Sequence, residues 1–337
     1  MIIRSRAPVR ISFAGGGTDV SPYCDEHGGA VVSASINKYA WGSLSLRHDK
    51  KIFIQDTYSD LMKFSSYRSL KYGTELDLLI AVVKKLWSSR EKGLNMFLRG
   101  DIPPRSGLGS SASAFVSLIG LFNYLKHEKK MTDYEVAELA FQLEREELNN
   151  KGGRQDQYVS VFGGINYIEF KGDDFVRVNP LKLKKDHLLE LEKNLLLVYA
   201  MDRSVSGDII TDQTKSYMQK KKNVVEALHS SKALALEVNY ALRKGDFEKF
   251  GRLLHEGWDV KKKFSPMMTN RYIDSIYQLA RKHGAMGGKI TGAGGGGHMF
   301  FYCEPNKEQV VARKLEEAGA KVVPFTFDLE GLQTWEV

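Results

Sequence analysis

The stretch PPRSGLGSSASAF, residues 103–115, interrupts an otherwise ordinary chain. A strand-like run at 95–98 leads into two prolines, and a turn of glycine and serine then opens a long apolar stretch. A glycine-rich turn that feeds a helix presents the first backbone N–H groups of that helix, which have no partner within it. These donors and the positive end of the helix dipole favour a phosphate group. The stretch therefore predicts a phosphate loop in front of a buried helix at 111–125.

The residue types in this loop fit the same interpretation. Gly107 and Gly109 allow the backbone to curl closely around a ligand. The hydroxyl groups of Ser110 and Ser111 can cap the helix or reach a phosphate-bound Mg²⁺, which prefers oxygen ligands. A plain turn whose serines only cap the helix is the structural alternative. The loop is not a Walker A motif, because no Gly-Lys-Ser/Thr closes it.

Length and composition bound the class of protein. A chain of 337 residues suits two domains better than one, and 42% hydrophobic residues supply a sizeable core. The net charge of +8 is scattered among 41 acidic residues, which indicates anionic small ligands rather than nucleic acid. Cys24 and Cys303 fit no metal or disulfide pattern, so we expect a reducing, cytoplasmic location. Residues 1–13 read as a strand and not as a signal peptide, and no apolar run of membrane-spanning length occurs.

The pattern of elements predicts two α+β domains, at 1–185 and 186–337, with a polar boundary around 173–191. A capping box, Thr132 to Glu135, opens a helix that extends to about 148. Strands are expected at 2–6, 9–13, 30–36, 39–46, 51–55, 95–98, 163–170, 194–201, 288–290, 298–302 and 321–326. Further helices are expected at 77–87, 207–230, 231–243, 246–263, 270–283 and 307–318.

A second glycine-rich loop lies in KITGAGGGGHMFFY, residues 289–302. Gly292, Gly294 and Gly297 satisfy G-x-G-x-x-G, but the residues that follow predict a strand, whereas the dinucleotide fingerprint requires a helix. A flexible hairpin turn is the alternative. Five glycines between 292 and 297 exceed what a hairpin needs, and each costs backbone entropy. Close approach to a ligand or to the other glycine loop explains the excess better.

A third loop lies in RAPVRISFAGGGTD, residues 6–19, where Gly15, Gly16 and Gly17 end a strand. Asp19 follows, and its carboxylate could accept two hydrogen bonds from sugar hydroxyls. Taken alone, it fits a turn aspartate equally well.

Together and in this order, the three loops resemble the GHMP superfamily of small-molecule kinases over nearly the whole chain. Residues 107–113 look like its phosphate loop, 289–297 like its C-terminal glycine motif and 6–19 like its N-terminal motif. In the last, Gly15-Gly16-Gly17 replaces the usual Gly-Glu-His. That variant, with GGRQDQYVSVFGG at 152–164, is similar to the branch that phosphorylates the anomeric hydroxyl of D-glycero-D-manno-heptose 7-phosphate on the way to GDP-heptose. The small residues leave room for a larger, phosphorylated sugar.

The resemblance implies an α+β, two-domain fold with the active site in the cleft. Its N-terminal domain would be ribosomal-protein-like with a left-handed βαβ unit, and its C-terminal domain ferredoxin-like. It implies ATP and Mg²⁺ as cofactors and a sugar phosphate as the acceptor, with no nucleic acid or membrane partner. A monomer or a homodimer is expected.

The resemblance also assigns roles to residues. Asp156 matches the catalytic base, Arg10 the cation that faces it, and Glu144 with Ser111 the Mg²⁺ ligands. The alternative is that Glu144 lies on a solvated helix face. Glu146 or Glu147 could also be mistaken for the Mg²⁺ ligand in place of Glu144. The nucleotide loop is expected to comprise Pro104, Gly107, Leu108, Gly109, Ser110, Ser111 and Ala112. Substrate contacts are expected from Gly16, Gly17, Thr18, Asp19, Lys151, Arg154, Gly294 and Gly295.

The cations Lys38, Arg105, Lys151, Arg154 and Arg203 lie in or near the motifs, and a sugar phosphate requires some of them. Lys151 and Arg154 are the preferred candidates because they flank Asp156. In the C-terminal half, Leu253, Leu254 and Trp258 are expected in the core, and His298 is expected to be structural.

Other functions stay open at this stage. Another GHMP anomeric sugar kinase, galactokinase-like or fucokinase-like, fits the same motifs. An RNA-binding protein fits the basic charge, although no basic patch interleaved with aromatic residues is present. An NAD-dependent oxidoreductase is disfavoured by the strand expected after Gly297.

Overall fold

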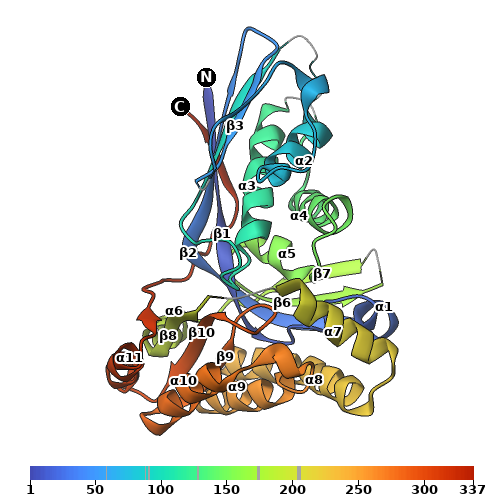
Figure 1. Cartoon of the computed structure of the whole chain (residues 1–337). Helices are drawn as coiled ribbons and strands as arrows, with labels where there is room; N and C mark the ends of the chain where they lie inside the picture. The colour runs from blue at the N-terminus through green and yellow to red at the C-terminus, as the bar shows by residue number, and fades with distance from the viewer. Residues whose placement is uncertain (58, 88, 90–91, 127–128, 173–174, 203–205) are drawn as a thin grey trace.

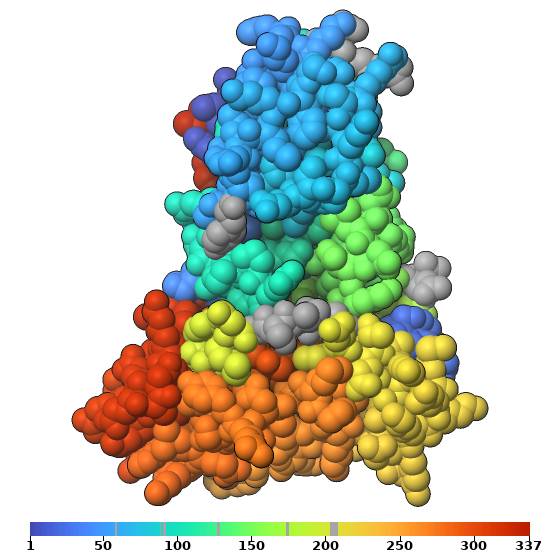
Figure 2. All heavy atoms as spheres, in the orientation of Figure 1, coloured from blue at the N-terminus to red at the C-terminus, as the bar shows by residue number. Residues whose placement is uncertain are grey.

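The computed structural model describes residues 1–337 except 58, 88, 90–91, 127–128, 173–174 and 203–205. The N-terminal half forms a tall upper lobe and most of the C-terminal half a broad lower lobe (Figures 1 and 2). Both termini lie together at the top of the upper lobe, where Ile2 and Val337 exchange backbone hydrogen bonds. In the described part of the chain, no helix combines the length and apolar character that a bilayer crossing requires.

Two long antiparallel strands, β1 (Ile2–Ala14) and β2 (Gly29–Leu46), form the backbone of the upper sheet. The sequence predicted each of them as two shorter strands, but each continues past its irregularity, and the pairing shifts register between Pro8 and Val9. The sheet order is β12-β1-β2-β5-β3-β4. In addition, β6 pairs with β2, and β7 pairs with β6. The remaining bounds are β3 Ile52–Gln55, β4 Met62–Phe64, β5 Leu94–Gly100, β6 Ile165–Lys171, β7 Phe175–Pro180 and β12 Gln333–Glu336.

Helix α3 (Ser110–Leu125) packs against β1 and β2 and is buried on nearly every side from Ala112 to Phe122. This confirms the buried helix expected after the phosphate loop. The capping box is also confirmed, since Thr132 Oγ1 accepts a hydrogen bond from the backbone N–H of Glu135. The other helices of this half are α1 Tyr23–His27, α2 Asp77–Leu86, α4 Asp133–Phe141, a π-helical turn Gln142–Glu147 and α5 Gln155–Phe162.

The lower lobe is a four-stranded antiparallel sheet, ordered β11-β8-β10-β9, with helices packed against it (Figure 1). Its strands are β8 Leu195–Met201, β9 Ala285–Ile290, β10 Gly297–Cys303 and β11 Lys321–Val322. Its helices are α6 Lys185–Asn194, α7 Ser206–Met218, α8 Lys222–Lys244, α9 Phe247–Lys261, α10 Arg271–Lys282 and α11 Glu308–Glu317.

One aromatic cluster joins the two lobes. Phe13 of β1 packs edge-to-face on Phe250 of α9 and Phe300 of β10, with ring centroids 5.5 and 5.6 Å apart. Leu253, Leu254 and Trp258 are buried in the same core, as predicted. The lobes therefore share a hydrophobic core and do not merely touch.

Two expectations about boundaries change, and a third stays untested. The break predicted between helices near 230 lies at 219–221, where Lys220 adopts a φ of 53°, and α8 runs unbroken from there. The polar segment expected as a domain boundary carries β7 and α6 in its described part. The division at 185 stays a prediction, but β12 pairs with β1, so the last strand belongs to the upper sheet.

A pair of leucines tests the shared core. Leu254 of α9 is 1% exposed and Leu236 of α8 is 39% exposed. We expect Leu254→Ala to lower the free energy of unfolding by about 2–5 kcal/mol, because it leaves a cavity. The matched Leu236→Ala should change it by no more than about 0.5 kcal/mol. Urea denaturation measures both, and equal losses in the two variants would contradict this assignment of the core.

Candidate active site

A cavity of about 440 Å³ lies where the two lobes meet, and all three glycine-rich loops line it. Its walls include Arg10 and Asp19 from the first loop region, Gly107 from the second and Gly292 from the third. Segments that are almost 300 residues apart in the sequence therefore share one site, as the sequence analysis expected.

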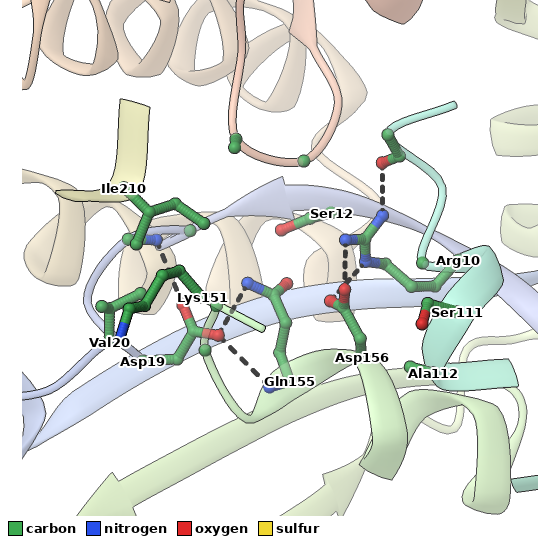
Figure 3. Close-up of a pocket in the computed structure, with 18 of the residues that line it drawn as sticks. Arg10, Ser12, Asp19, Val20, Ser111, Ala112, Lys151, Gln155, Asp156 and Ile210 are labelled. Carbon is green, nitrogen blue, oxygen red and sulfur yellow. Dashed lines mark hydrogen bonds and ion pairs between the residues drawn. The ribbon is translucent and has the colours of Figure 1, made fainter. Parts of the chain in front are cut away.

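Arg10 and Asp156 form the central ion pair of this cavity (Figure 3). Arg10 Nε donates to Asp156 Oδ1 and Arg10 Nη2 donates to Asp156 Oδ2, both at 2.8 Å. The third nitrogen, Nη1, donates to the carbonyl oxygen of Gly107 at 2.6 Å. Arg10 is buried, whereas Asp156 keeps part of its surface in the cavity. A bidentate pair fixes the carboxylate in both position and plane.

The phosphate loop has the shape that its glycines predict. Gly107 and Gly109 have φ angles of 84° and 77°, a region that favours glycine. Gly109 is the N-cap of α3 and no side chain caps the helix, so neither Ser110 nor Ser111 takes the capping role that the sequence left open. The amide groups of the first turn therefore stand at the edge of the cavity, where they could bind an anion.

The third loop packs directly on the phosphate loop. The backbone N–H and the ring Nδ1 of His298 lie 3.1 and 2.8 Å from the carbonyl oxygen of Ser106. A side chain at Gly297 would collide with the same carbonyl group. This contact accounts for glycine at 297, gives His298 a structural environment, and places a strand rather than a helix after the loop. The dinucleotide alternative lacks the helix it needs.

Asp19 is buried in the cavity wall, and Gln155 lies between it and Asp156 (Figure 3). Its Oδ2 accepts hydrogen bonds from the backbone N–H of Gln155 at 3.2 Å and from Gln155 Nε2 at 3.1 Å. Burial, and next the charge of Asp156, raise the pKa of Asp19, and the hydrogen bonds from Gln155 oppose that rise. A side chain at Gly153 would run into the Asp19 carboxylate, which explains a glycine there.

Glu144 and Ser111 both line the cavity, as expected for oxygen ligands of Mg²⁺. Glu144 is buried in the π-helical turn, a feature common at functional sites, and is not the solvated alternative. Gln157 Nε2 donates to its Oε2 at 2.6 Å, which orients the carboxylate. No group of three or more His, Cys, Asp or Glu able to hold a metal occurs among the described residues. One carboxylate and one hydroxyl suit Mg²⁺, which keeps water and phosphate ligands.

Most of the predicted site residues line the cavity, but five do not. Thr18 and Leu108 are buried behind it, and Thr18 Oγ1 bonds to backbone carbonyl groups instead. Gly294 and Gly295 turn toward Met268, whose carbonyl oxygen accepts a hydrogen bond from the Gly295 N–H. Arg154 lies over the Phe141 ring and 3.9 Å from Glu138, so the structure places it outside the cavity.

The candidate cations divide in the same way. Arg105 and Lys151 line the cavity, Lys38 does not, and Arg203 lies outside the described residues. Sequence reasoning missed several lining residues: Ser12, Arg145, Gln155, Lys261 and Lys289. Lys289 is the first residue of the glycine motif at 289–297, and this position in the motif could have identified it as a site residue. Lys261 sits in a run of three lysines that reads as a solvated face, so only the fold reveals it.

Comparison with known proteins agrees with this geometry. Two family models match the chain: GHMP kinases N terminal domain over residues 77–164 and GHMP kinases C terminal over 238–321. A Campylobacter jejuni protein named D-glycero-alpha-D-manno-heptose 7-phosphate kinase is 33% identical over 341 residues and covers 99% of both chains. A galactokinase of Pyrococcus furiosus is 24% identical, covering 92% of this chain and 91% of its own.

Solved structures give the same picture of the fold. The crystal structure of a D-glycero-D-manno-heptose 1-phosphate kinase from Bacteroides thetaiotaomicron superposes with a TM-score of 0.83 at 33% identity, covering 99% of both chains. The Lactococcus lactis galactokinase complexed with galactose has a TM-score of 0.77 at 17% identity, covering all of this chain and 95% of its own.

The raised pKa of Asp19 generates a pH prediction. A carboxyl group whose folded-state pKa lies above its ordinary 3.8 opposes folding once it ionises. That cost is absent below the ordinary pKa and fully present above the raised one. The stability of the wild type relative to Asp19→Asn should therefore fall as pH rises from below 3.8 toward neutrality. Urea denaturation across this range measures the difference, and Asp186→Asn on the exposed start of α6 is the control. A difference that does not change with pH would refute the prediction.

Proposed function

The chain belongs to the GHMP kinase family, and from this premise we propose that it transfers the γ-phosphoryl group of ATP to the anomeric hydroxyl of D-glycero-D-manno-heptose 7-phosphate. The product would be the 1,7-bisphosphate, a precursor of GDP-heptose. As a family member, the protein is a phosphotransferase with an alcohol group as acceptor and acts as a sugar kinase. The identity of the sugar, the position of transfer and the pathway are the proposal.

The observation that carries this proposal is the bidentate pair of Arg10 and Asp156 beside the phosphate loop. Phosphoryl transfer needs aligned groups and a base that takes the proton of the attacking hydroxyl. In our proposal, Asp156 takes this proton as the hydroxyl oxygen bonds to the γ-phosphorus and ADP leaves. Arg10 fixes the direction of the carboxylate through two hydrogen bonds.

The nucleotide would lie on the phosphate loop. The open first turn of α3 offers amide donors, and Pro104, Gly107, Gly109 and Ala112 line the same wall. Ser111 and Glu144 would hold Mg²⁺, which when bound neutralises phosphate charge.

The acceptor sugar would lie on the opposite wall, against Gly16, Gly17 and Asp19. Asp19 can accept sugar hydroxyls because its carboxylate faces the cavity and is already oriented by Gln155. A neighbouring cavity of about 680 Å³ shares Val20, Arg145 and Lys151 with the first. This extra room supports an acceptor longer than a hexose.

A second candidate is another anomeric sugar kinase, and the similarity to a galactokinase supports it. The names of the two relatives at 33% identity also differ in the phosphate that they mention, 7-phosphate for one and 1-phosphate for the other. The protein should therefore be offered free heptose, heptose 1-phosphate, heptose 7-phosphate, galactose and fucose with Mg-ATP. We expect preferred turnover of the 7-phosphate and a new phosphorus NMR signal coupled to the anomeric proton. Transfer to another carbon, or better turnover of an unphosphorylated sugar, would contradict the proposal.

The proposed base has its own test. Asp156→Asn should reduce kcat by about 10²–10⁴-fold, because the amide cannot take the proton, yet leave ATP binding nearly unchanged. Steady-state kinetics and nucleotide titration measure the two quantities. Asp186→Asn removes the same charge from an exposed site and should keep full activity. Near-wild-type turnover in Asp156→Asn would remove the residue from this role.

A further inference from the structure

Two polar groups that line the cavity have no partner in the described protein and no task in the mechanism above. Lys289, near the end of β9, is 4% exposed, and its Nζ makes no hydrogen bond or ion pair with any described residue. Ser12, on β1, is also 4% exposed, and its Oγ is buried without a hydrogen-bond partner among the described residues. Both side chains belong to the wall of the cavity (Figure 3 labels Ser12). A buried polar group is costly unless something pairs with it.

The charged groups around Lys289 favour binding of an anion. Among them, the cations Lys261 and Arg10 affect the pKa of Lys289 most, and the carboxylate of Asp19 has a smaller effect in the opposite direction. Arg10 is already neutralised by Asp156, and Asp19 is held by Gln155. Burial first, and then the Lys261 and Arg10 charges, lower the pKa of Lys289 well below its ordinary value. Among the described residues, neither Asp19 nor Asp156 forms an ion pair with Lys289.

Lys261 adds a second cation to the same place. It is the last residue of α9, is buried, and its Nζ donates to the carbonyl oxygen of Gly292 at 2.6 Å. Gly292 begins the glycine loop that follows β9, so the Lys261 ammonium group stands at the entrance of that loop. The charge of Lys261 is also one of the influences that act on Lys289.

We propose that Lys289, together with Ser12 and Lys261, forms a binding site for a phosphoryl group in the wall of the cavity. The ligand class is a terminal phosphoryl group that carries negative charge, for which lysine acts as a point charge and serine as a donor. The inference rests on the proposed function, since a kinase of a sugar phosphate handles two such groups. The source is either the phosphate already on the acceptor or the γ-phosphoryl group in transit.

The first experiment does not depend on the sugar. Melting temperatures are measured in inorganic phosphate and in chloride at equal ionic strength. Phosphate should raise the melting temperature of the wild type and of Lys282→Met, an exposed control on α10. It should raise that of Lys289→Met by clearly less, because only the phosphate loop remains to bind the anion. In chloride, Lys289→Met should be at least as stable as the wild type because an unpaired buried charge is removed. Ser12→Ala should show a reduced shift. Equal shifts in Lys289→Met and the wild type would overturn the site.

The second experiment assigns the source. Binding of heptose and heptose 7-phosphate is compared for the wild type, Lys289→Met and Ser12→Ala, and kcat is measured with the preferred acceptor. If the site holds the acceptor's phosphate, Lys289→Met should weaken binding of heptose 7-phosphate at least roughly tenfold and leave free heptose unaffected. If it holds the γ-phosphoryl group, sugar binding should stay unchanged while kcat falls at least roughly tenfold with the preferred acceptor. Unchanged binding and kcat in a folded Lys289→Met would refute both.

These outcomes separate the site from the proposed function. If the wild type does not use heptose 7-phosphate but phosphate stabilises it clearly more than it stabilises Lys289→Met, the phosphoryl site stands and the sugar assignment fails. If the wild type turns over heptose 7-phosphate and Lys289→Met behaves identically, the function stands and the site fails.

Discussion

One buried guanidinium group holds the active site together. Arg10 lies on the strand that runs through the centre of the molecule, and its side chain bonds to Asp156 at the start of α5 and to Gly107 in the phosphate loop. Its own backbone N–H donates to the carbonyl oxygen of Leu108 at 2.9 Å. The same residue therefore fixes the proposed base and the proposed nucleotide loop relative to each other. Breaking such a buried pair from one side costs about 3–5 kcal/mol, because a charge is left without a partner.

The rest of the architecture follows from where that strand runs. β1 pairs along nearly its whole length with β2 in the upper sheet, and its far end carries Phe13 into the aromatic cluster of the lower lobe. The third glycine loop reaches the phosphate loop through His298 and Ser106. The Phe13 contacts and the contact between His298 and Ser106 thus hold the two lobes together beside the cavity.

Local chemistry predicted much of this structure. The glycines at 107 and 109, the apolar residues after them and the Thr132 capping box each act within a few neighbours, and each was predicted correctly. The resemblance of three motifs supplied what local chemistry could not, namely that these loops meet. Neither local chemistry nor the resemblance predicted that Lys261 lines the cavity, because its burial depends on how α9 packs against β9. Arg154 was misjudged for the opposite reason: it flanks Asp156 in sequence, but the turn at the start of α5 directs it to Phe141.

The charges of the cavity are arranged in two sets. Asp156 and Asp19 stand together, where a hydroxyl-bearing acceptor would lie, and the cations Arg10, Lys261 and Lys289 stand around them. This arrangement suits a reaction in which an anionic group moves toward a carboxylate-activated hydroxyl, because the cations offset the repulsion between them.

The central claim is that the three loops enclose one site in which the terminal group of a bound triphosphate faces Asp156. The most direct measurement is a crystal structure with a non-hydrolysable ATP analogue, Mg²⁺ and heptose 7-phosphate. The account predicts the phosphate chain at the first turn of α3 and the terminal phosphorus between Asp156 and the anomeric oxygen, with Arg10 still paired. A nucleotide bound outside the cavity, or a terminal phosphate turned away from Asp156, would contradict it.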